Sequence, residues 1–137
     1  MYNKQVLGSI GEKAAIEYLE GRGYTIVEKN FRCKLGEIDI IAADNDVIAF
    51  IEVKTRSSDI FGKPGEAVNF YKQRKIVQTA LAFIKQKKLY DWMSRFDVVE
   101  VIADDYDNII DINLIKNALE YSGKYGYWED PKKAHQC

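Results

Sequence analysis

Two stretches of the chain carry apolar residues at the spacing of an α-helix. In residues 5–20 they recur at every fourth position, at Val6, Ile10, Ala14 and Tyr18, with Leu7 and Ala15 beside them. Gly21 and Gly23 follow directly and predict the end of this helix. The second helix is expected over about residues 67–88, with apolar residues along one side at Phe70, Val77, Leu81 and Ile84.

Short apolar runs bounded by polar turns predict strands between and after these helices. Residues 36–44 and 46–56 are two such runs, joined at a turn of Asp and Asn, so we expect an antiparallel hairpin there. Pro64 and Gly65 predict a loop over residues 61–69. Further strands are expected at residues 24–32, 95–103 and 109–115. The order helix, strands, helix, strands predicts an α/β or α+β domain with helices around a central mixed β-sheet.

One predicted strand places two charged residues where apolar residues are expected. Glu52 and Lys54 point to the same face as Ile48 and Phe50, because side chains alternate along a strand. Asp39, on the preceding strand, can join them if the register of the hairpin allows it. A cross-strand salt bridge on a solvated face is the ordinary explanation for such residues. The apolar row that the charged pair continues argues against it, because a solvated face should be polar throughout.

Two carboxylates and a lysine on one patch of sheet suit a divalent cation. Burying unpaired charges carries a large desolvation cost, and a hard cation offsets that cost. Mg²⁺ is typically bound by one or two carboxylates together with water and a substrate phosphate. A nearby lysine can hold the phosphate or help to orient and acidify a metal-bound water. Asp39, Glu52 and Lys54 therefore indicate a candidate Mg²⁺ site that acts on a phosphate ester.

Length and composition set the frame for this candidate site. At 137 residues the chain fits one domain, expected at residues 1–122, followed by an aromatic and polar tail at residues 123–137. The tail's aromatic residues either stack on bases or, more commonly, hold a tail to its own domain. No stretch is apolar enough for a membrane span and the N-terminus lacks the pattern of a secretory signal. We therefore expect a cytoplasmic protein with no membrane partner.

Charge is distributed unevenly although the net charge is −1. Residues 56–88 contain eight basic and two acidic residues, whereas residues 97–130 contain nine acidic and two basic ones. This asymmetry permits one basic face suited to a polyanion. A solvated helix face is the simpler explanation when charge is considered alone.

The charged pattern resembles a known nuclease motif. Asp39, a hairpin and then Glu52-Val53-Lys54 match the PD-(D/E)xK pattern of the restriction-endonuclease-like superfamily, with Ile38 in the variable position of the motif's proline. The longer stretch that contains "GSIGEKAAIEYLEGRGY", "GEIDIIA", "FIEVKTR" and "FGKPGEAVNFYKQRKI" resembles the bacterial YraN family. That family is grouped with the same superfamily and likened to Holliday-junction resolvases. The resemblance covers residues 8–118 and implies a restriction-endonuclease-like core.

The resemblance also implies roles for individual residues. Asp39 and Glu52 would be the metal carboxylates, with the carbonyl of Val53 as a further ligand, and Lys54 would be the catalytic lysine. Glu12 matches a helix glutamate that resolvase-like members bring to the metal, often through water.

Other matched positions have weaker support. Gln73 matches a helix glutamine seen near the site of related nucleases. An exposed helix position explains Gln73 nearly as well, and for Glu12 the sequence alone favours an ordinary surface position without any role in the site. Glu37 would serve as an outer acid or simply cap the strand. Candidate phosphate contacts are Arg56, Lys72, Arg74 and Lys75, because cationic side chains dominate affinity for a nucleic-acid backbone.

Three functions are compatible with these residues. The first is an endonuclease, dependent on Mg²⁺ or Mn²⁺, that cuts DNA; a preference for branched DNA is an analogy with resolvases, and cutting both strands of a symmetric junction would favour a homodimer. The second is a nucleic-acid-binding module with a nuclease fold and no catalysis. The third is a structural or protein-interaction domain. The intact Asp39, Glu52 and Lys54 count against the second, because a binding module needs no metal carboxylates.

Overall fold

The computed structural model describes residues 4–57 and 70–118, apart from the side chains of residues 4–5 and 70–73. The described elements are α1 (Lys4–Gly21), β1 (Thr25–Cys33), β2 (Gly36–Asp44), β3 (Val47–Ser57), α2 (Phe70–Lys87), β4 (Met93–Ala103) and β5 (Ile109–Ile115). Each predicted helix and strand is present, with bounds that differ by a few residues. The predicted loop at residues 61–69 and the tail at residues 123–137 lie outside the described residues.

The five strands form one mixed sheet in the order β1-β2-β3-β4-β5. Neighbouring strands are antiparallel except for β3 and β4, which are parallel. Parallel neighbours require a long crossover connection, and α2 lies in the connection between β3 and β4. The predicted α/β class with a central mixed sheet is confirmed, and this architecture is consistent with a restriction-endonuclease-like core.

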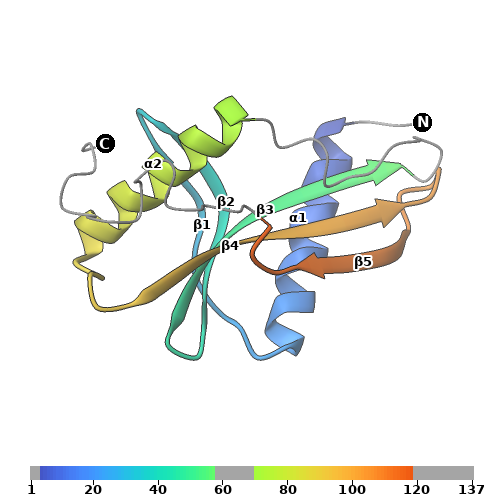
Figure 1. Cartoon of the computed structure of the whole chain (residues 1–137). Helices are drawn as coiled ribbons and strands as arrows, with labels where there is room; N and C mark the ends of the chain where they lie inside the picture. The colour runs from blue at the N-terminus through green and yellow to red at the C-terminus, as the bar shows by residue number, and fades with distance from the viewer. Residues whose placement is uncertain (1–3, 58–69, 119–137) are drawn as a thin grey trace.

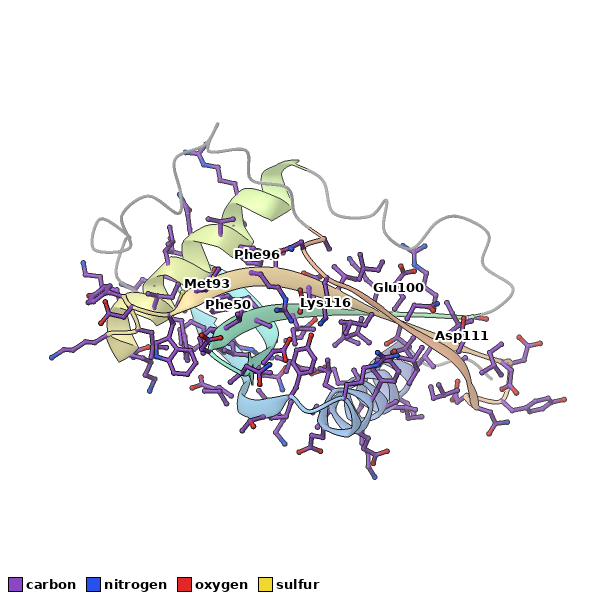
Figure 2. The ribbon with its side chains drawn as sticks, turned by 60° about the horizontal axis from the view of Figure 1, so that its bottom comes forward. Phe50, Met93, Phe96, Glu100, Asp111 and Lys116 are labelled. Atoms are coloured by element: carbon purple, nitrogen blue, oxygen red, sulfur yellow. The ribbon has the colours of Figure 1, made fainter. Side chains whose placement is uncertain are left out.

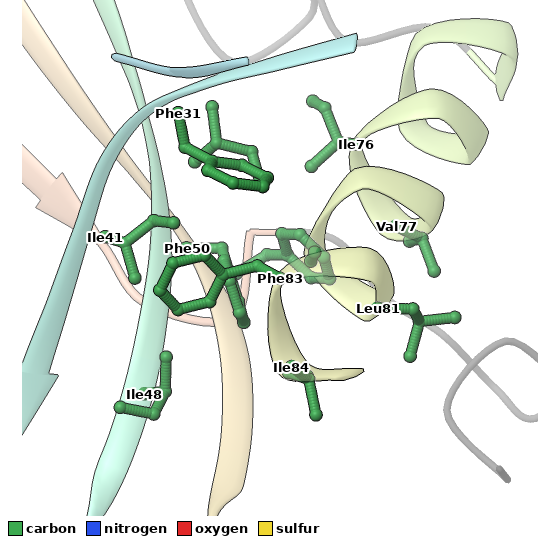
Figure 3. Close-up of a cluster of buried hydrophobic side chains, with 12 residues drawn as sticks. Phe31, Ile41, Ile48, Phe50, Ile76, Val77, Leu81, Phe83 and Ile84 are labelled. Atoms are coloured by element: carbon green, nitrogen blue, oxygen red, sulfur yellow. The ribbon is translucent and has the colours of Figure 1, made fainter. Parts of the chain in front are cut away.

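The two helices cover opposite faces of the sheet (Figure 1). Under α2, aromatic residues of the sheet pack around Phe83, whose ring lies edge-on to Phe31 and Phe50 with centroids 5.0 and 6.1 Å away (Figure 3). Under α1, a second cluster joins Ala15 and Leu19 to Ile51 and other aliphatic residues of the sheet. Strand β3 is therefore buried on both faces along its first half, which explains its almost unbroken apolar sequence.

The buried row of α1 differs by one position from the predicted row. The residues that face the sheet are Leu7, Gly11, Ala15 and Leu19, whereas Val6 is 48% exposed. Both rows have a spacing of four, so apolar spacing alone does not separate them. Gly11 decides the outcome, because a Cβ there would collide with the side chain of Thr55 on β3. The lack of a side chain lets α1 approach the sheet closely at this point.

In the part of the chain that the structure describes, no helix combines the length and the apolar character needed to cross a membrane.

Candidate active site

Strands β2 and β3 separate at Asp39. Their pairing runs from Asp44↔Val47 to Ile40↔Ile51 and ends one residue before Asp39. There the Asp39 carboxylate takes the place of a backbone acceptor: the Val53 N–H donates a hydrogen bond to its Oδ2 at 2.8 Å. The side chain is thus held in the opening between the two strands.

The alternation of side chains along β2 is interrupted at the same place. Ile38 and Ile41 both belong to the cluster under α2, whereas Ile40 belongs to the cluster under α1. Strict alternation, which predicted one face for Glu37, Asp39 and Ile41, would have kept Ile38 and Ile41 on opposite faces. The interruption turns Asp39 toward the backbone of β3, where it bonds to Val53.

Glu52 and Lys54 continue the apolar row of β3, as the sequence predicts. Their charged groups form an ion pair, with Lys54 Nζ 3.5 Å from Glu52 Oε1. The two side chains are only 14% (Lys54) and 18% (Glu52) exposed. Glu52 also borders a small cavity that is lined mainly by apolar side chains of the sheet and by Ile76 of α2, together with Glu37 and Asp97. The pair is therefore largely withdrawn from water and unlike a solvated surface salt bridge.

Asp39 lies in a group of carboxylates. Burial raises the pKa of Asp39 to about 6; the hydrogen bond from Val53 opposes this rise, and the negative charges of Glu52, Glu12 and Glu37 add to it. Burial and the three neighbouring carboxylates each favour a proton or a cation at Asp39. Perturbed carboxylates of this kind are common at functional sites.

Helix α1 brings Glu12 to this group. Glu12 follows Gly11, the residue in close contact with β3. The close approach of the helix therefore fixes the position of the Glu12 backbone relative to β3. Burial raises the pKa of Glu12, the charge of Glu37 raises it further, and Arg32 acts in the opposite direction. We call Asp39, Glu52, Lys54 and Glu12 the strand-split cluster.

The strand-split cluster offers an incomplete set of ligands for a cation. Among the described residues, no group of three or more Asp, Glu, His or Cys side chains forms a ready-made metal site. Mg²⁺ and Mn²⁺ do not need one, because these hard cations keep several waters and combine one or two carboxylates with substrate phosphate. The carboxylate oxygens of Asp39 and Glu52 fit this mode of Mg²⁺ or Mn²⁺ binding, because a cation between them would offset the repulsion between the two negative charges.

The structure describes the remaining predicted residues to different extents. Arg56 is half-buried on β3, and Arg74 and Lys75 are exposed near the start of α2. Lys75 lies close to Gly36 at the start of β2, and the next residue, Ile76, lines the same small cavity as Glu52, so this end of α2 lies near Glu52. Lys72 and Gln73 belong to the same first turns of α2, but their side chains are outside the described set. The role of the Val53 carbonyl as a ligand stays a prediction.

Two residues near the strand-split cluster escaped the sequence analysis. Arg32 pairs with Glu37 at 3.3 Å, and its side chain is 72% exposed. Glu100 on β4 pairs in register with Lys54 and is buried. Arg32 and Glu37 lie opposite each other in the hairpin of β1 and β2. The short polar turn between these strands is a sequence signal that could have indicated this pairing. The position of Glu100 depends on the parallel register of β3 and β4, for which the local sequence carries no signal.

A second charged group, also not predicted, is centred on Arg95 of β4. Arg95 Nε donates to both carboxylate oxygens of Asp97 at 2.9 and 3.0 Å, and its Nη2 donates to Asp44 at 2.9 Å and to the Tyr24 hydroxyl at 2.6 Å. The Tyr24 hydroxyl and the N–H of Asn117 donate to Asp97 at 3.2 and 3.1 Å. We call Arg95, Asp97, Asp44 and Tyr24 the arginine cluster.

The two carboxylates of the arginine cluster are matched by two cations, because Lys116 Nζ lies 3.6 Å from Asp44 Oδ2 in addition to Arg95. Hydrogen bonding to Arg95 holds the pKa of Asp44 below its usual value. Burial alone would lower the pKa of Arg95, but its hydrogen bonds to Asp97 and Asp44 outweigh burial and raise it. Burial and the charge of Asp97 raise the pKa of Tyr24 to about 12. Charges that are paired in this way indicate a structural role.

Comparison with known proteins places the chain in a family. Residues 11–101 match the model described as "Uncharacterised protein family UPF0102". A UPF0102 protein of Clostridium tetani is 50% identical over 119 residues, which cover 87% of this chain and 97% of the relative. UPF0102 proteins of Caldicellulosiruptor saccharolyticus and Clostridium botulinum are each 51% identical, over 85% and 87% of this chain and 99% and 98% of their own lengths.

Fold and site together define an α/β protein with an acidic group where two central strands separate. The chain belongs to the UPF0102 family. This is the family named YraN in the sequence analysis, so the predicted family is confirmed. The matched segment contains the strand-split cluster in full, together with Glu100.

Proposed function

We propose that the protein is an endonuclease that hydrolyses phosphodiester bonds in DNA and depends on Mg²⁺ or Mn²⁺. One observation carries this proposal: the Asp39 carboxylate, held by the Val53 N–H at 2.8 Å, lies among other carboxylates at the opening between β2 and β3. A divalent cation relieves the repulsion in such a group, and the adjacent Lys54 suits a phosphate oxygen.

Each residue of the strand-split cluster has a part in the proposed reaction. The cation, when bound, stabilises developing negative charge and makes a bound water more acidic. Asp39 and Glu52 hold the cation, and the Val53 carbonyl is the further ligand that the family resemblance implies. Lys54 binds a non-bridging oxygen of the scissile phosphate. Glu12, on the α1 side, orients water at the site.

Cationic residues around the cluster are proposed to bind the DNA backbone. Arg32 pairs with Glu37, and Lys75, which follows Arg74 on α2, lies close to Gly36 on the strand that carries Asp39. Arg56 and Lys72 complete this proposed set, with Gln73 beside them on α2. Phosphate contacts of this type give binding that weakens steeply with salt and does not depend on base sequence. Branched DNA is the substrate form that the resolvase resemblance favours, and a homodimer would present two sites to it.

A nicking assay tests the proposal. Linear, flapped and four-way DNA are incubated with the protein in EDTA, Mg²⁺ or Mn²⁺, beside Asp39→Asn and Lys54→Met. We expect cutting only with metal and a loss of at least about 100-fold in rate for each variant, the scale for removing a group that stabilises transition-state charge. Asp111→Asn, an exposed carboxylate on β5, is the matched control and should cut like the wild type.

The same assay separates the alternative functions. Salt-sensitive DNA binding with no cutting in either metal would contradict catalysis and favour a non-catalytic binding module. Neither binding nor cutting would leave a structural or protein-interaction role as the better account. Cutting that survives Asp39→Asn would exclude the strand-split cluster as its source.

A further inference from the structure

Helix α2 is buried on all sides along its middle. Residues 79–84 are all buried, including Leu81 and Ala82, which are 4% and 5% exposed. A helix turns once in about 3.6 residues, so six consecutive residues face every direction around it. Helix α1, which packs on the sheet with one side, buries only every fourth residue over residues 11–19. Packing on the sheet alone therefore does not account for the burial of α2.

The sheet covers one side of α2, and the opposite side is also buried. Phe83 points toward the sheet in Figure 3, whereas Val77 and Leu81 point away from it. Val77 is nevertheless 0% exposed. The segment after α2 folds back on the last turn of the helix, where the Tyr90 hydroxyl donates to the Lys85 carbonyl at 3.5 Å. The side that carries Val77 and Leu81, which we call the outer side of α2, therefore has a further cover.

This cover belongs to the same chain. The exposed fractions are those of a single chain, so a second copy does not account for them. Two longer segments lie outside the described residues, 58–69 and 119–137. Segment 58–69 joins Ser57 to Phe70 at the start of α2, so it would have to run about 16 Å along the helix to Leu81 and return. Segment 119–137 has no such return path, and it contains aromatic residues that suit an apolar surface: Tyr121, Tyr125, Tyr127 and Trp128.

Two described residues favour segment 119–137. The Ala118 N–H donates to the carbonyl of Phe96, a residue of the cluster under α2, at 2.8 Å, and Figure 2 shows Lys116 beside β4 near Phe96. Cys33 of β1 packs against the same cluster and is disulfide-bonded, and the sequence contains one other cysteine, Cys137. Strands β4 and β1 are three strand spacings apart, about 14 Å, which 19 residues span easily. A segment that joins these two strands on this face of the sheet passes over α2.

We propose that residues 119–137 dock on the outer side of α2 and that a disulfide between Cys137 and Cys33 fastens them there. The aromatic residues of this segment cover Val77 and Leu81, and so hold the tail to its own domain. When the disulfide forms from two thiols, a small-molecule disulfide such as oxidised glutathione takes up the two electrons and two protons and leaves as two thiols. This docking does not depend on the proposed function.

Hydrogen exchange of the full chain tests the docking. One variant replaces the four tail aromatics together, by Tyr121→Ser, Tyr125→Ser, Tyr127→Ser and Trp128→Ser. The amides of residues 79–84 should then exchange at least about tenfold faster than in the wild type, because a helix that loses its cover opens more readily. Exchange of residues 14–20 in α1 should change by no more than about twofold. Tyr106→Ser, which removes an 86%-exposed aromatic side chain, is the matched control and should change neither segment.

A second variant separates the two candidate segments. Ile60→Ser combined with Phe61→Ser removes two neighbouring apolar side chains of segment 58–69. Exchange of residues 79–84 should stay within about twofold of the wild type in this variant. Exchange that rises as much as in the tail variant, or a tail variant that exchanges like the wild type, would overturn the docking of residues 119–137 on α2.

Peptide mapping tests the fastening separately. The full chain is treated with oxidised glutathione, digested without reduction and analysed by mass spectrometry. Most of the protein should yield a peptide pair joined through Cys33 and Cys137, and Cys33→Ser should abolish this pair. Glutathione attached separately to the two cysteines would contradict a disulfide between them.

Discussion

Two groups of largely buried charges in the described part of the chain differ in their balance of acidic and basic groups. In the arginine cluster, Asp97 and Asp44 both accept hydrogen bonds from Arg95, and Lys116 lies 3.6 Å from Asp44 on its other side. In the strand-split cluster, acidic groups outnumber basic ones and the pKa of Asp39 is raised. The first arrangement stabilises a fold, and the second stores repulsion that a ligand can relieve. We therefore expect the arginine cluster to support the fold and, under the proposed function, the strand-split cluster to bind a cation.

The largest effect on stability is expected from Arg95→Met. The Asp97 side chain has no exposed surface, so removing Arg95 leaves a buried carboxylate with only a hydroxyl and a backbone N–H as donors. Breaking one partner of a buried pair typically costs about 3–5 kcal/mol. Urea unfolding should show this loss. Lys116→Met, which removes a 55%-exposed partner of Asp44, is the control and should cost at most about 1 kcal/mol.

The same substitution, Asp to Asn, should have opposite effects in the two clusters. Asp39→Asn keeps an acceptor for the Val53 N–H and removes a charge, so we expect the metal-free protein to gain about 1–3 kcal/mol at pH 8. Asp44→Asn removes the charge that Arg95 needs and should cost about 1–3 kcal/mol. Urea unfolding in EDTA measures both. A destabilised Asp39→Asn protein would contradict stored repulsion in the strand-split cluster.

The advantage of Asp39→Asn should depend on pH. Because the pKa of Asp39 is raised from 3.8 to about 6 in the folded protein, the folded state takes up the proton more readily than the unfolded state between these values. The wild type therefore gains stability relative to Asp39→Asn as the pH falls through about 6. Asp44, whose pKa is lowered, should show the reverse: its contribution is lost as the pH falls. Urea unfolding from pH 8 to pH 4 measures this. If the pKa of Asp39 were not shifted, the difference in unfolding free energy between the wild type and Asp39→Asn would stay constant over this range.

An effect of similar size is expected at Gly11, which sets the distance between α1 and the strand-split cluster. Gly11→Ala should cost about 1–3 kcal/mol, because the new Cβ meets Thr55 and the helix must move outward. Glu12 would move with it. Gly8→Ala is the matched control: nothing lies within 4 Å of its Cβ, so the better helix propensity should stabilise the protein by up to about 1 kcal/mol. Equal effects of the two changes would remove the case for close packing at Gly11.

The sequence predicts most of the fold because its local signals agree. Apolar spacing predicts α1 and α2, and the Asp-Asn turn between β2 and β3 predicts the hairpin that carries Asp39 and Glu52. The exact rotation of α1 was not predictable from spacing, since two neighbouring rows both repeat every four residues. Contact with Thr55, which lies far along the chain from Gly11, selects the buried row.

The candidate site was predictable only in part, for a similar reason. Glu52 and Lys54 are recognisable because they interrupt an apolar strand. The interrupted alternation at Asp39, the arginine cluster and the position of Glu100 all depend on how distant strands pair. Register between β3 and β4 in particular joins two segments that are far apart in the chain, and no short segment encodes it.

Mn²⁺ calorimetry on the same two Asp→Asn variants tests the central claim most directly. We predict that the wild type binds one Mn²⁺, that Asp39→Asn weakens binding at least about tenfold, and that Asp44→Asn changes it by no more than about twofold. The first loss follows from removing a ligand, and the second result from the full pairing of Asp44 with Arg95. No Mn²⁺ binding by the wild type, or equal affinity in Asp39→Asn, would contradict a cation site between β2 and β3.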